Sequence, residues 1–367
     1  MKQSRLTRLQ QEMIRQQIDC IALVPGPNMV YLSGIHSHLS ERPIILFLPA
    51  QDEPAIIIPT LEAMKAADAG VPQSRIFAWT DDDGYANAFT RAADQLQLNT
   101  MRLGVEALHM RVLELDLLQQ AAPGLQTVHA EPVLMTLRAV KEVEELEAMQ
   151  KAIHIAEAAI EKLLPKIKIG MTEKQIAALL TQYQLDGGAE GIAFGPIVSA
   201  GPNGASPHAV PTDRPIQEGD LLVIDWGCLV DGYPSDITRT FAVGDVDEEA
   251  RRIYELTRQA NEAGIAAAQP GATGDDVDTA ARKVIEAGGY GRYFIHRTGH
   301  GLGVEGHEPP FMMPGNHEPL VAGNVFTVEP GIYLPGHNGV RIEDNIVITA
   351  TSSHCMTSFT KELITVG

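Results

Sequence analysis

Short apolar runs alternate with longer amphipathic stretches over the first 130 residues of the chain. The runs of strand length are 21–24, 43–49, 55–59 and 102–106. The stretches with apolar residues at helical spacing are 61–69, 84–97 and 109–120. This alternation of two periods predicts an α/β domain. No glycine-rich phosphate loop opens any of its helices, so we assign it no chemistry.

The pattern changes near residue 132. From Leu137 to Leu164 the chain is rich in Ala, Glu, Lys and Leu, which predicts one long amphipathic helix. We therefore expect an N-terminal domain over 1–131 and a second domain over 133–367.

The second domain contains an internal repeat. Near residue 172 a long helix leads into a second helix that begins with capping-box spacing, and about a hundred residues later a helix near 247–268 does the same. At one constant offset, Gly170, Thr172 and Ile176 correspond to Gly271, Thr273 and Val277. Strand-like sequence with regular glycines follows each helix pair. A cleft between two related halves is a natural place for a site.

The segment LLVIDWGCLVDGYPSDITRTFAV predicts a β-hairpin around the turn Asp231-Gly232. Asp225 and Asp236 lie about equally far from that turn, so the two-residue period of a strand puts both carboxylates on one face. Two adjacent acids repel unless a positive charge lies between them. Either Asp could instead be a turn residue or a surface charge, but an apolar strand rarely buries an unpaired carboxylate.

A second hairpin is predicted by FTVEPGIYLPGHNGVRIEDNIVIT. Glu329 and Glu343 are nearly equidistant from its turn and can meet on neighbouring strands. Arg341 and Glu343 are two residues apart and share a face, so a surface ion pair is the alternative interpretation. That alternative does not explain the apolar neighbours of Glu343.

Four histidines lie near these acids in sequence patterns rich in glycine or proline. His296, His300 and His307 fall within HRTGHGLGVEGHEPP, whose glycines disfavour a helix. As a strand, the same segment puts His296 and His300 on one face. His208 lies in a loop that prolines stiffen, which alone is weak support.

Together these residues form a set typical of a dinuclear metal site. The set comprises four carboxylates and one imidazole, those of Asp225, Asp236, Glu329, Glu343 and His300. Oxygen ligands with an imidazole suit Mn, Co, Fe or Zn. Four carboxylates exceed the needs of one catalytic ion, so we expect two ions about 3.5–4 Å apart.

The composition excludes some classes of partner. The formal net charge is -19, which opposes nucleic-acid binding. No apolar run approaches the length of a membrane span. The three cysteines are scattered and form no CxxC motif, and the N-terminus lacks a signal peptide's apolar region, so we expect a cytoplasmic protein.

The ordered motifs IDWG, SDITRT, TGHGLG, VEPGIY and GVRIEDN closely resemble the pita-bread metallopeptidases of peptidase family M24. Within that family the chain looks most like prolidases and X-Pro aminopeptidases. The resemblance covers essentially the whole chain. It implies an α/β creatinase-like N-terminal domain and an α+β pita-bread C-terminal domain with an internal pseudo-two-fold repeat.

The resemblance also implies roles for individual residues. Asp236 and Glu343 bridge two metals, Asp225 binds one, and His300 with Glu329 binds the other. The residues implied in catalysis are Glu329, His208 and His307, and those implied in substrate binding are His208, His296, His307 and Arg341. For His296 and Arg341 the implied role is either to support the metal ligands or to contact the substrate carboxylate. Trp226 stands where the family more usually has a small aliphatic residue or methionine, and we expect only a packing difference.

The implied activity is hydrolysis of the peptide bond that precedes proline in X-Pro dipeptides, by a hydroxide between two metal ions. Mn is the first expectation for the metal, with Co, Zn or Fe as alternatives, and a homodimer is implied. An X-Pro aminopeptidase and a related hydrolase of a small non-peptide amide remain open alternatives. A non-catalytic pita-bread module is disfavoured because all five metal ligands are present.

Overall fold

The computed structural model describes residues 1–367 as two compact units, Met1–Arg138 and Ala139–Gly367. The division falls at the end of α6 (Glu131–Ala139), whereas the change in composition coincides with its beginning. Contacts of α6 explain this difference, because Leu137 accepts a hydrogen bond from Tyr31 and Arg138 donates one to Asn28. No helix in the chain has both the length and the apolar character that crossing a bilayer requires.

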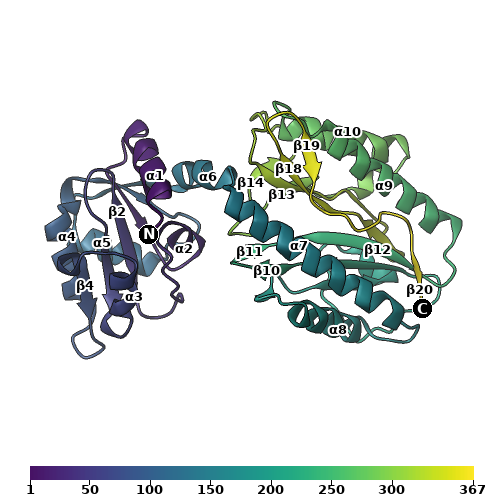
Figure 1. Ribbon diagram of the computed structural model, residues 1–367, viewed down its shortest axis with the longest axis horizontal. Coiled ribbons are helices and arrows are strands. Elements are labelled where there is room, and N and C mark those ends of the chain that lie inside the picture. Colours follow the sequence, from purple (N-terminus) through teal and green to yellow (C-terminus); the bar gives the residue numbers. More distant parts are fainter. The chain divides into compact units, whose positions relative to one another are not determined.

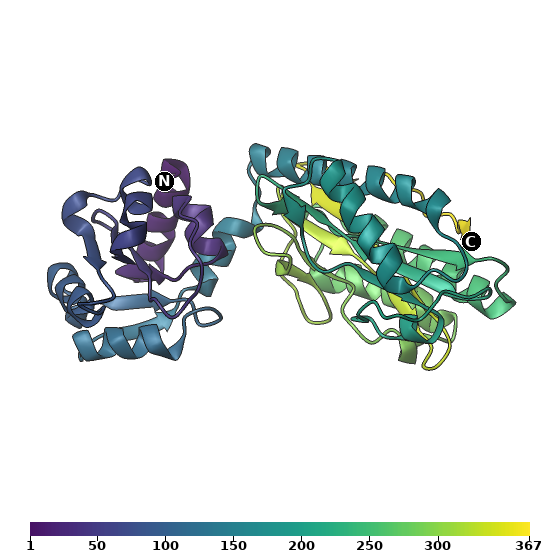
Figure 2. The same ribbon diagram turned by 90° about the horizontal axis from the view of Figure 1, so that it is seen from below.

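The first unit is a six-stranded mixed sheet in the order β4-β3-β2-β1-β5-β6. Its elements before α6 are α1 (Gln3–Arg15), β1 (Cys20–Leu23), α2 (Pro27–Ser33), β2 (Ile45–Pro49), β3 (Ala55–Pro59), α3 (Ala63–Asp68), β4 (Ile76–Trp79), α4 (Ala86–Leu96), β5 (Arg102–Val105), α5 (Val112–Ala121) and β6 (Gln126–His129). Helices α4 and α5 cover one face and α1 and α2 the other (Figures 1 and 2). The predicted α/β domain is confirmed, although α2, β4 and β6 are short elements that the pattern did not predict.

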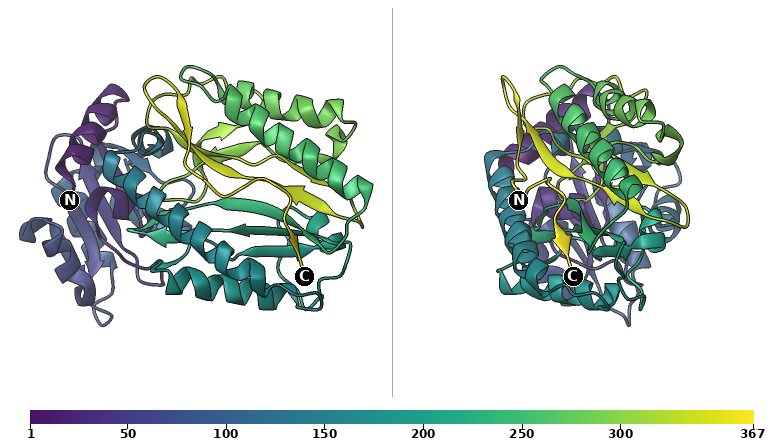
Figure 3. Two further views of the ribbon diagram at one scale, coloured as in Figure 1. Left: turned by 45° about the vertical axis from the view of Figure 1, so that its right-hand side comes forward. Right: turned by 90° about the vertical axis from the view of Figure 1, so that its right-hand side faces the viewer.

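The second unit has two main sheets, β20-β12-β9-β8 and β14-β13-β15-β18-β19. Its elements are α7 (Val143–Leu163), α8 (Glu173–Asp186), β7 (Gly191–Ile192), β8 (Ile197–Ala200), β9 (Leu221–Trp226), β10 (Cys228–Val230), β11 (Tyr233–Pro234), β12 (Ile237–Val243), α9 (Glu248–Ala267), α10 (Gly274–Ala287), β13 (Gly299–Gly301), β14 (Glu308–Met312), β15 (Val325–Val328), β16 (Gly331–Tyr333), β17 (Gly339–Arg341), β18 (Asp344–Ile348), β19 (Ser353–Cys355) and β20 (Thr365–Val366). In Figure 3 the strands lie between the pair α7 and α8 and the pair α9 and α10.

The helices are held by apolar faces that pack on the strands. Ile153 of α7 and Ile176 of α8 are fully buried in one core with Ile224 and Phe241 of the first sheet. Full burial of such a side chain contributes about 1.5–3 kcal/mol. This packing fixes the strands from outside and leaves their inner faces for polar side chains.

The single long helix predicted from Leu137 to Leu164 is wrong, because the structure interrupts it after α6. Val140 pairs with Asn324 in an isolated β-bridge, and α7 begins only at Val143. Glu142 and Glu145 form a capping box at this start, which satisfies backbone N–H groups that a continuous helix would use.

The two halves of this unit share details of geometry that confirm the internal repeat. Thr172 and Thr273 each cap the second helix of a pair through a capping box. Gly170 and Gly271 precede them with φ of 91° and 85°, a conformation that favours glycine. Equivalent turns therefore start equivalent helices in the two halves.

Candidate metal centre

Asp225 and Asp236 are placed by the first hairpin. Strand β9 pairs with β12 so that Asp225 lies opposite Thr238, and Asp236 is two residues from Thr238 on the same face. The predicted turn is present, with φ of 51° at Asp231 and 76° at Gly232. Trp226 is on the opposite face, where its indole N–H donates to the Ala156 carbonyl at 2.9 Å. Both carboxylates therefore face away from the core.

The second half brings Glu329 and Glu343 to the same place. Glu329 directly follows β15, and Glu343 directly precedes the neighbouring strand β18. Glu343 also joins the two halves, because its N–H donates to the Thr238 carbonyl at 3.0 Å and its side chain accepts from the Thr238 hydroxyl at 2.6 Å. Acids from two hairpins thus meet between the sheets.

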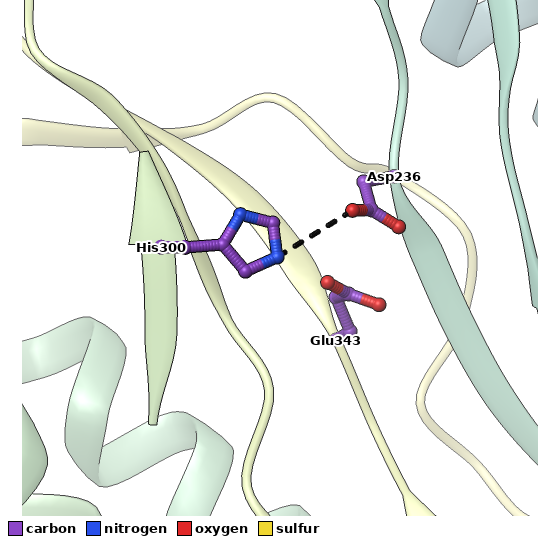
Figure 4. A group of neighbouring side chains, drawn as sticks. All are labelled: Asp236, His300 and Glu343. Carbon is purple, nitrogen blue, oxygen red and sulfur yellow. Dashed lines mark ion pairs between the residues drawn. The ribbon is translucent and has the colours of Figure 1, made fainter. Parts of the chain in front are cut away.

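His300 comes from β13, where the flanking glycines permit close strand contacts. A Cβ at Gly299 would lie 1.9 Å from the Thr327 carbonyl oxygen, and one at Gly301 would lie 2.3 Å from that of Pro309. The His300 ring presents Nε2 to Glu329 Oε1 at 3.3 Å and to Asp236 Oδ2 at 3.7 Å. Candidate ligand atoms of Asp236, His300 and Glu343 all lie within 4.8 Å of one another (Figure 4).

The protonation state of His300 suits a metal ligand. Burial lowers its pKa to about 3, so the imidazole is neutral near pH 7. Nδ1 lies 3.1 Å from the Gly301 carbonyl oxygen and carries the proton to donate there. Nε2 is therefore an acceptor beside the carboxylate oxygens of Glu329 and Asp236, and a cation between these atoms satisfies all three.

The buried acids destabilise one another. Burial, followed by repulsion from Glu343 and Asp225, raises the pKa of Asp236 well above its ordinary value. Burial, followed by repulsion from Glu329 and Asp225, does the same for Glu343. Burial raises the pKa of Glu329 to about 7. Asp225 Oδ1 is buried without a hydrogen-bond partner. Divalent cations fit this oxygen-rich set because they supply the missing positive charge.

The guanidinium of Arg341 is held by hydrogen bonds at the edge of this acid cluster. Its guanidinium donates to Asp225 Oδ2 at 2.6 Å and to the Tyr333 hydroxyl at 3.0 Å. It also donates to the Thr238 hydroxyl and to the Pro207 carbonyl, both at 3.1 Å. Of the two predicted alternatives for Arg341, these contacts favour support of the metal ligands.

His296 belongs to the same hydrogen-bonded chain. Strand β13 begins only at Gly299, so the prediction of a strand that includes His296 is wrong, although His296 and His300 line the same cavity. Instead Nε2 of His296 lies 2.9 Å from the Tyr333 hydroxyl, and Nδ1 lies 2.7 Å from the Arg297 carbonyl oxygen. Burial lowers its pKa to about 4, so Nδ1–H donates to Arg297 and Nε2 accepts from Tyr333.

The nine predicted site residues all line one cavity of about 840 Å³. His307 stacks on His300 with ring centroids 3.8 Å apart, and His208 lies in the segment 207–211 that forms another part of the wall. The remaining wall is mainly apolar, formed by Ala177, Phe194, Gly195, Pro196, Ile197, Pro207, Ala209, Val210 and Pro211. The cavity therefore pairs a polar centre with an apolar wall that fits a small apolar ring.

Arg297 also lines this cavity and was not predicted. Its position between two candidate histidines in HRTGH was the available signal.

Comparison with known proteins gives two family matches. Residues 147–350 match the profile of metallopeptidase family M24, and residues 5–140 match that of the creatinase/prolidase N-terminal domain.

Relatives and solved structures extend these matches over the whole chain. The Xaa-Pro dipeptidase of Pyrococcus furiosus is 35% identical over 361 residues, which cover 98% of this chain and 99% of that protein. A crystal structure of prolidase from Thermococcus sibiricus superposes with a TM-score of 0.94 at 33% identity and covers 100% of both chains. Dipeptidase PepE from Mycobacterium ulcerans gives a TM-score of 0.92 at 36% identity and covers 99% of this chain and 97% of its own.

Proposed function

The chain belongs to metallopeptidase family M24, and we propose that it hydrolyses the peptide bond that precedes proline in X-Pro dipeptides. The observation that carries this proposal is the convergence of five metal-type donors with an apolar wall in one cavity. The relatives named Xaa-Pro dipeptidase and prolidase support the choice of substrate.

We assign two divalent cations to Asp225, Asp236, His300, Glu329 and Glu343. When bound, such cations lower the pKa of water and polarise a carbonyl oxygen. Because hard oxygen donors dominate the set, we propose manganese, with cobalt, zinc and iron as competitors.

The chain's own groups then hold protons and position the substrate. We assign Glu329, a carboxylate at the metal centre, the role of accepting and returning a proton during hydrolysis. His307 has its pKa lowered by burial and is neutral near pH 7, so an N–H of its ring can donate a hydrogen bond to a substrate oxygen. We assign His208 a similar donor role on the opposite loop.

The apolar wall accounts for proline. Phe194, Pro196, Ile197 and Val210 offer a surface that excludes water from a pyrrolidine ring. The nitrogen of the X-Pro peptide bond belongs to proline and carries no hydrogen, so the site needs no acceptor for it.

We further propose a reducing, cytoplasmic location and a homodimeric assembly. The location is supported by three free cysteines, of which Cys20 and Cys228 are buried. The assembly is proposed from family resemblance alone, and the mass in solution tests it.

Hydrolysis of Ala-Pro tests the proposed function, with Ala-Pro-Ala and Met-Ala as competing substrates and with EDTA and Mn²⁺ as controls. We expect metal-dependent release of proline from Ala-Pro at the highest kcat/KM. Higher kcat/KM on Ala-Pro-Ala would indicate an aminopeptidase. No turnover of any peptide by metal-loaded protein would reject the proposal.

A further inference from the structure

Two arginines line the cavity, Arg297 and Arg341, and they differ in how their charge is used. Arg341 is fully buried in its ion pair with Asp225 and makes three further hydrogen bonds. Four of its five N–H groups are therefore used, and its charge is already paired with Asp225. Arg297 is half-buried and makes no ion pair, so its charge is available to an anion in the cavity.

Contacts of Arg297 hold the guanidinium in place without neutralising it. Its side chain stacks on Phe311, with Cζ 4.4 Å from the ring centroid. Nη2 lies 3.3 Å from Nδ1 of His307, and the backbone carbonyl accepts from His296. A planar guanidinium fixed in this way still offers N–H groups to a carboxylate.

The surroundings of Arg297 favour an incoming anion. Burial lowers the pKa of Arg297, because the guanidinium loses contact with water and nearby acids do not fully compensate for this loss. Glu329 is the acid that partly offsets this effect, and in the proposed function Glu329 is occupied by a cation. A carboxylate bound at Arg297 would therefore compensate the guanidinium for its lost hydration through charge-assisted hydrogen bonds.

The location suits the end of a dipeptide. In X-Pro the C-terminal carboxylate is one residue from the scissile bond, and one residue spans about 3.8 Å. Arg297 is separated from the metal centre by one side chain, because His307 contacts Arg297 through Nδ1 and stacks on His300. The carboxylate at Arg297 and the scissile carbonyl at the metal centre can therefore both lie next to His307.

Resting on the proposed function, we propose that Arg297 binds the C-terminal carboxylate of the substrate and thereby selects dipeptides over longer or capped peptides. A longer peptide presents a neutral amide at this position and loses the charge-assisted pair. This assignment replaces Arg341 as the carboxylate contact.

The test compares Ala-Pro with Ala-Pro amide, which differ only in the charge at the C-terminus. The variants are Arg297→Met, Arg297→Lys and the control Arg292→Met. Arg292 stacks on Tyr293 at 4.6 Å and lies outside this cavity. Wild-type protein and the control should prefer Ala-Pro by about 10–100-fold in kcat/KM, the scale of one hydrogen-bonded charge.

In Arg297→Met this preference should fall below about threefold, mainly through a higher KM for Ala-Pro. Arg297→Lys should retain an intermediate preference, and it carries the test if Arg297→Met does not fold. An unchanged ratio, or equal losses on both substrates with unchanged metal content, would overturn the assignment. Failure of wild-type protein to cleave either substrate would instead reject the proposed function.

Discussion

Nη2 of Arg341 lies 2.6 Å from Oδ2 of Asp225, and both side chains are buried beside three further carboxylates. Arg341 thereby places a cationic side chain at the acid cluster itself. The same guanidinium contacts Tyr333, which contacts His296, so one hydrogen-bonded chain connects Asp225 with the backbone of Arg297. Placement of the metal centre and placement of Arg297 are therefore coupled.

Replacement of Arg341 should impair the site for every substrate. In Arg341→Ala the buried carboxylate of Asp225 loses its partner, and breaking a buried pair costs about 3–5 kcal/mol. We expect weaker metal binding and similar losses of kcat/KM on Ala-Pro and Ala-Pro-Ala. A loss confined to the dipeptide would show that Arg341 contacts the substrate carboxylate.

Removal of one charge from the acid cluster should separate metal binding from folding. Asp236→Asn and Glu343→Gln keep the side-chain shape, so we expect folded protein with little bound metal and kcat/KM reduced by at least about 10²–10³-fold. Because repulsion is relieved, the metal-free variants should melt above metal-free wild type at pH 8. Metal analysis and thermal unfolding measure both effects, and full metal occupancy in both variants would contradict the assigned ligands.

Metal-free protein should lose stability as the pH rises through about 7. Asp236, Glu329 and Glu343 have folded pKa values above their ordinary ones, so stability present at low pH is lost as the pH rises through those values. The buried His296 and His300 have lowered pKa values and are neutral in the folded protein over this range. Each acid contributes at most about 1.4 kcal/mol per pH unit.

The matching measurement is thermal unfolding with EDTA and with excess Mn²⁺ at each pH. Bound Mn²⁺ should abolish the loss of stability with rising pH. Bound cations require the ionised carboxylates and bind more tightly as the pH rises. A flat profile for the metal-free protein would contradict the electrostatic description of the cluster.

Crowding at β13 should make Gly301 far less tolerant of substitution than Gly306, which follows the strand. A Cβ at Gly301 would lie 2.3 Å from the Pro309 carbonyl, whereas one at Gly306 has no atom within 4 Å. Gly301→Ala should therefore displace His300 and reduce metal affinity by roughly 10–100-fold, the scale of disturbing a ligand's support. Gly306→Ala is the matched control, and equal affinities in the two variants would argue against this packing constraint.

The buried ion pair between Lys141 and Glu308 should stabilise the strand next to His307. Their charged atoms lie 2.5 Å apart, and both side chains are almost fully buried. Lys141→Met should lower the free energy of unfolding by about 3–5 kcal/mol, because the buried Glu308 carboxylate loses its contact with the Lys141 charge. The double variant Lys141→Met with Glu308→Gln should recover part of this loss, and denaturant titration measures the coupling.

Local periodicity in the sequence explains much of the fold and the site. The two-residue period and the Asp231-Gly232 turn are enough to put Asp225 and Asp236 on one face. The break at Val140 escapes prediction because it depends on pairing with Asn324, which is distant in the sequence. For the same reason the partners of Arg341 and the stacking of Arg297 on Phe311 could not be read from spacing.

The internal repeat distributes the five donors unequally. Asp225 and Asp236 come from the first half, whereas His300, Glu329 and Glu343 come from the second. Neither half alone supplies all five donors, so cations bound there would link the two halves of the repeat. Metal binding would then add to the contacts that hold the two halves of this domain together.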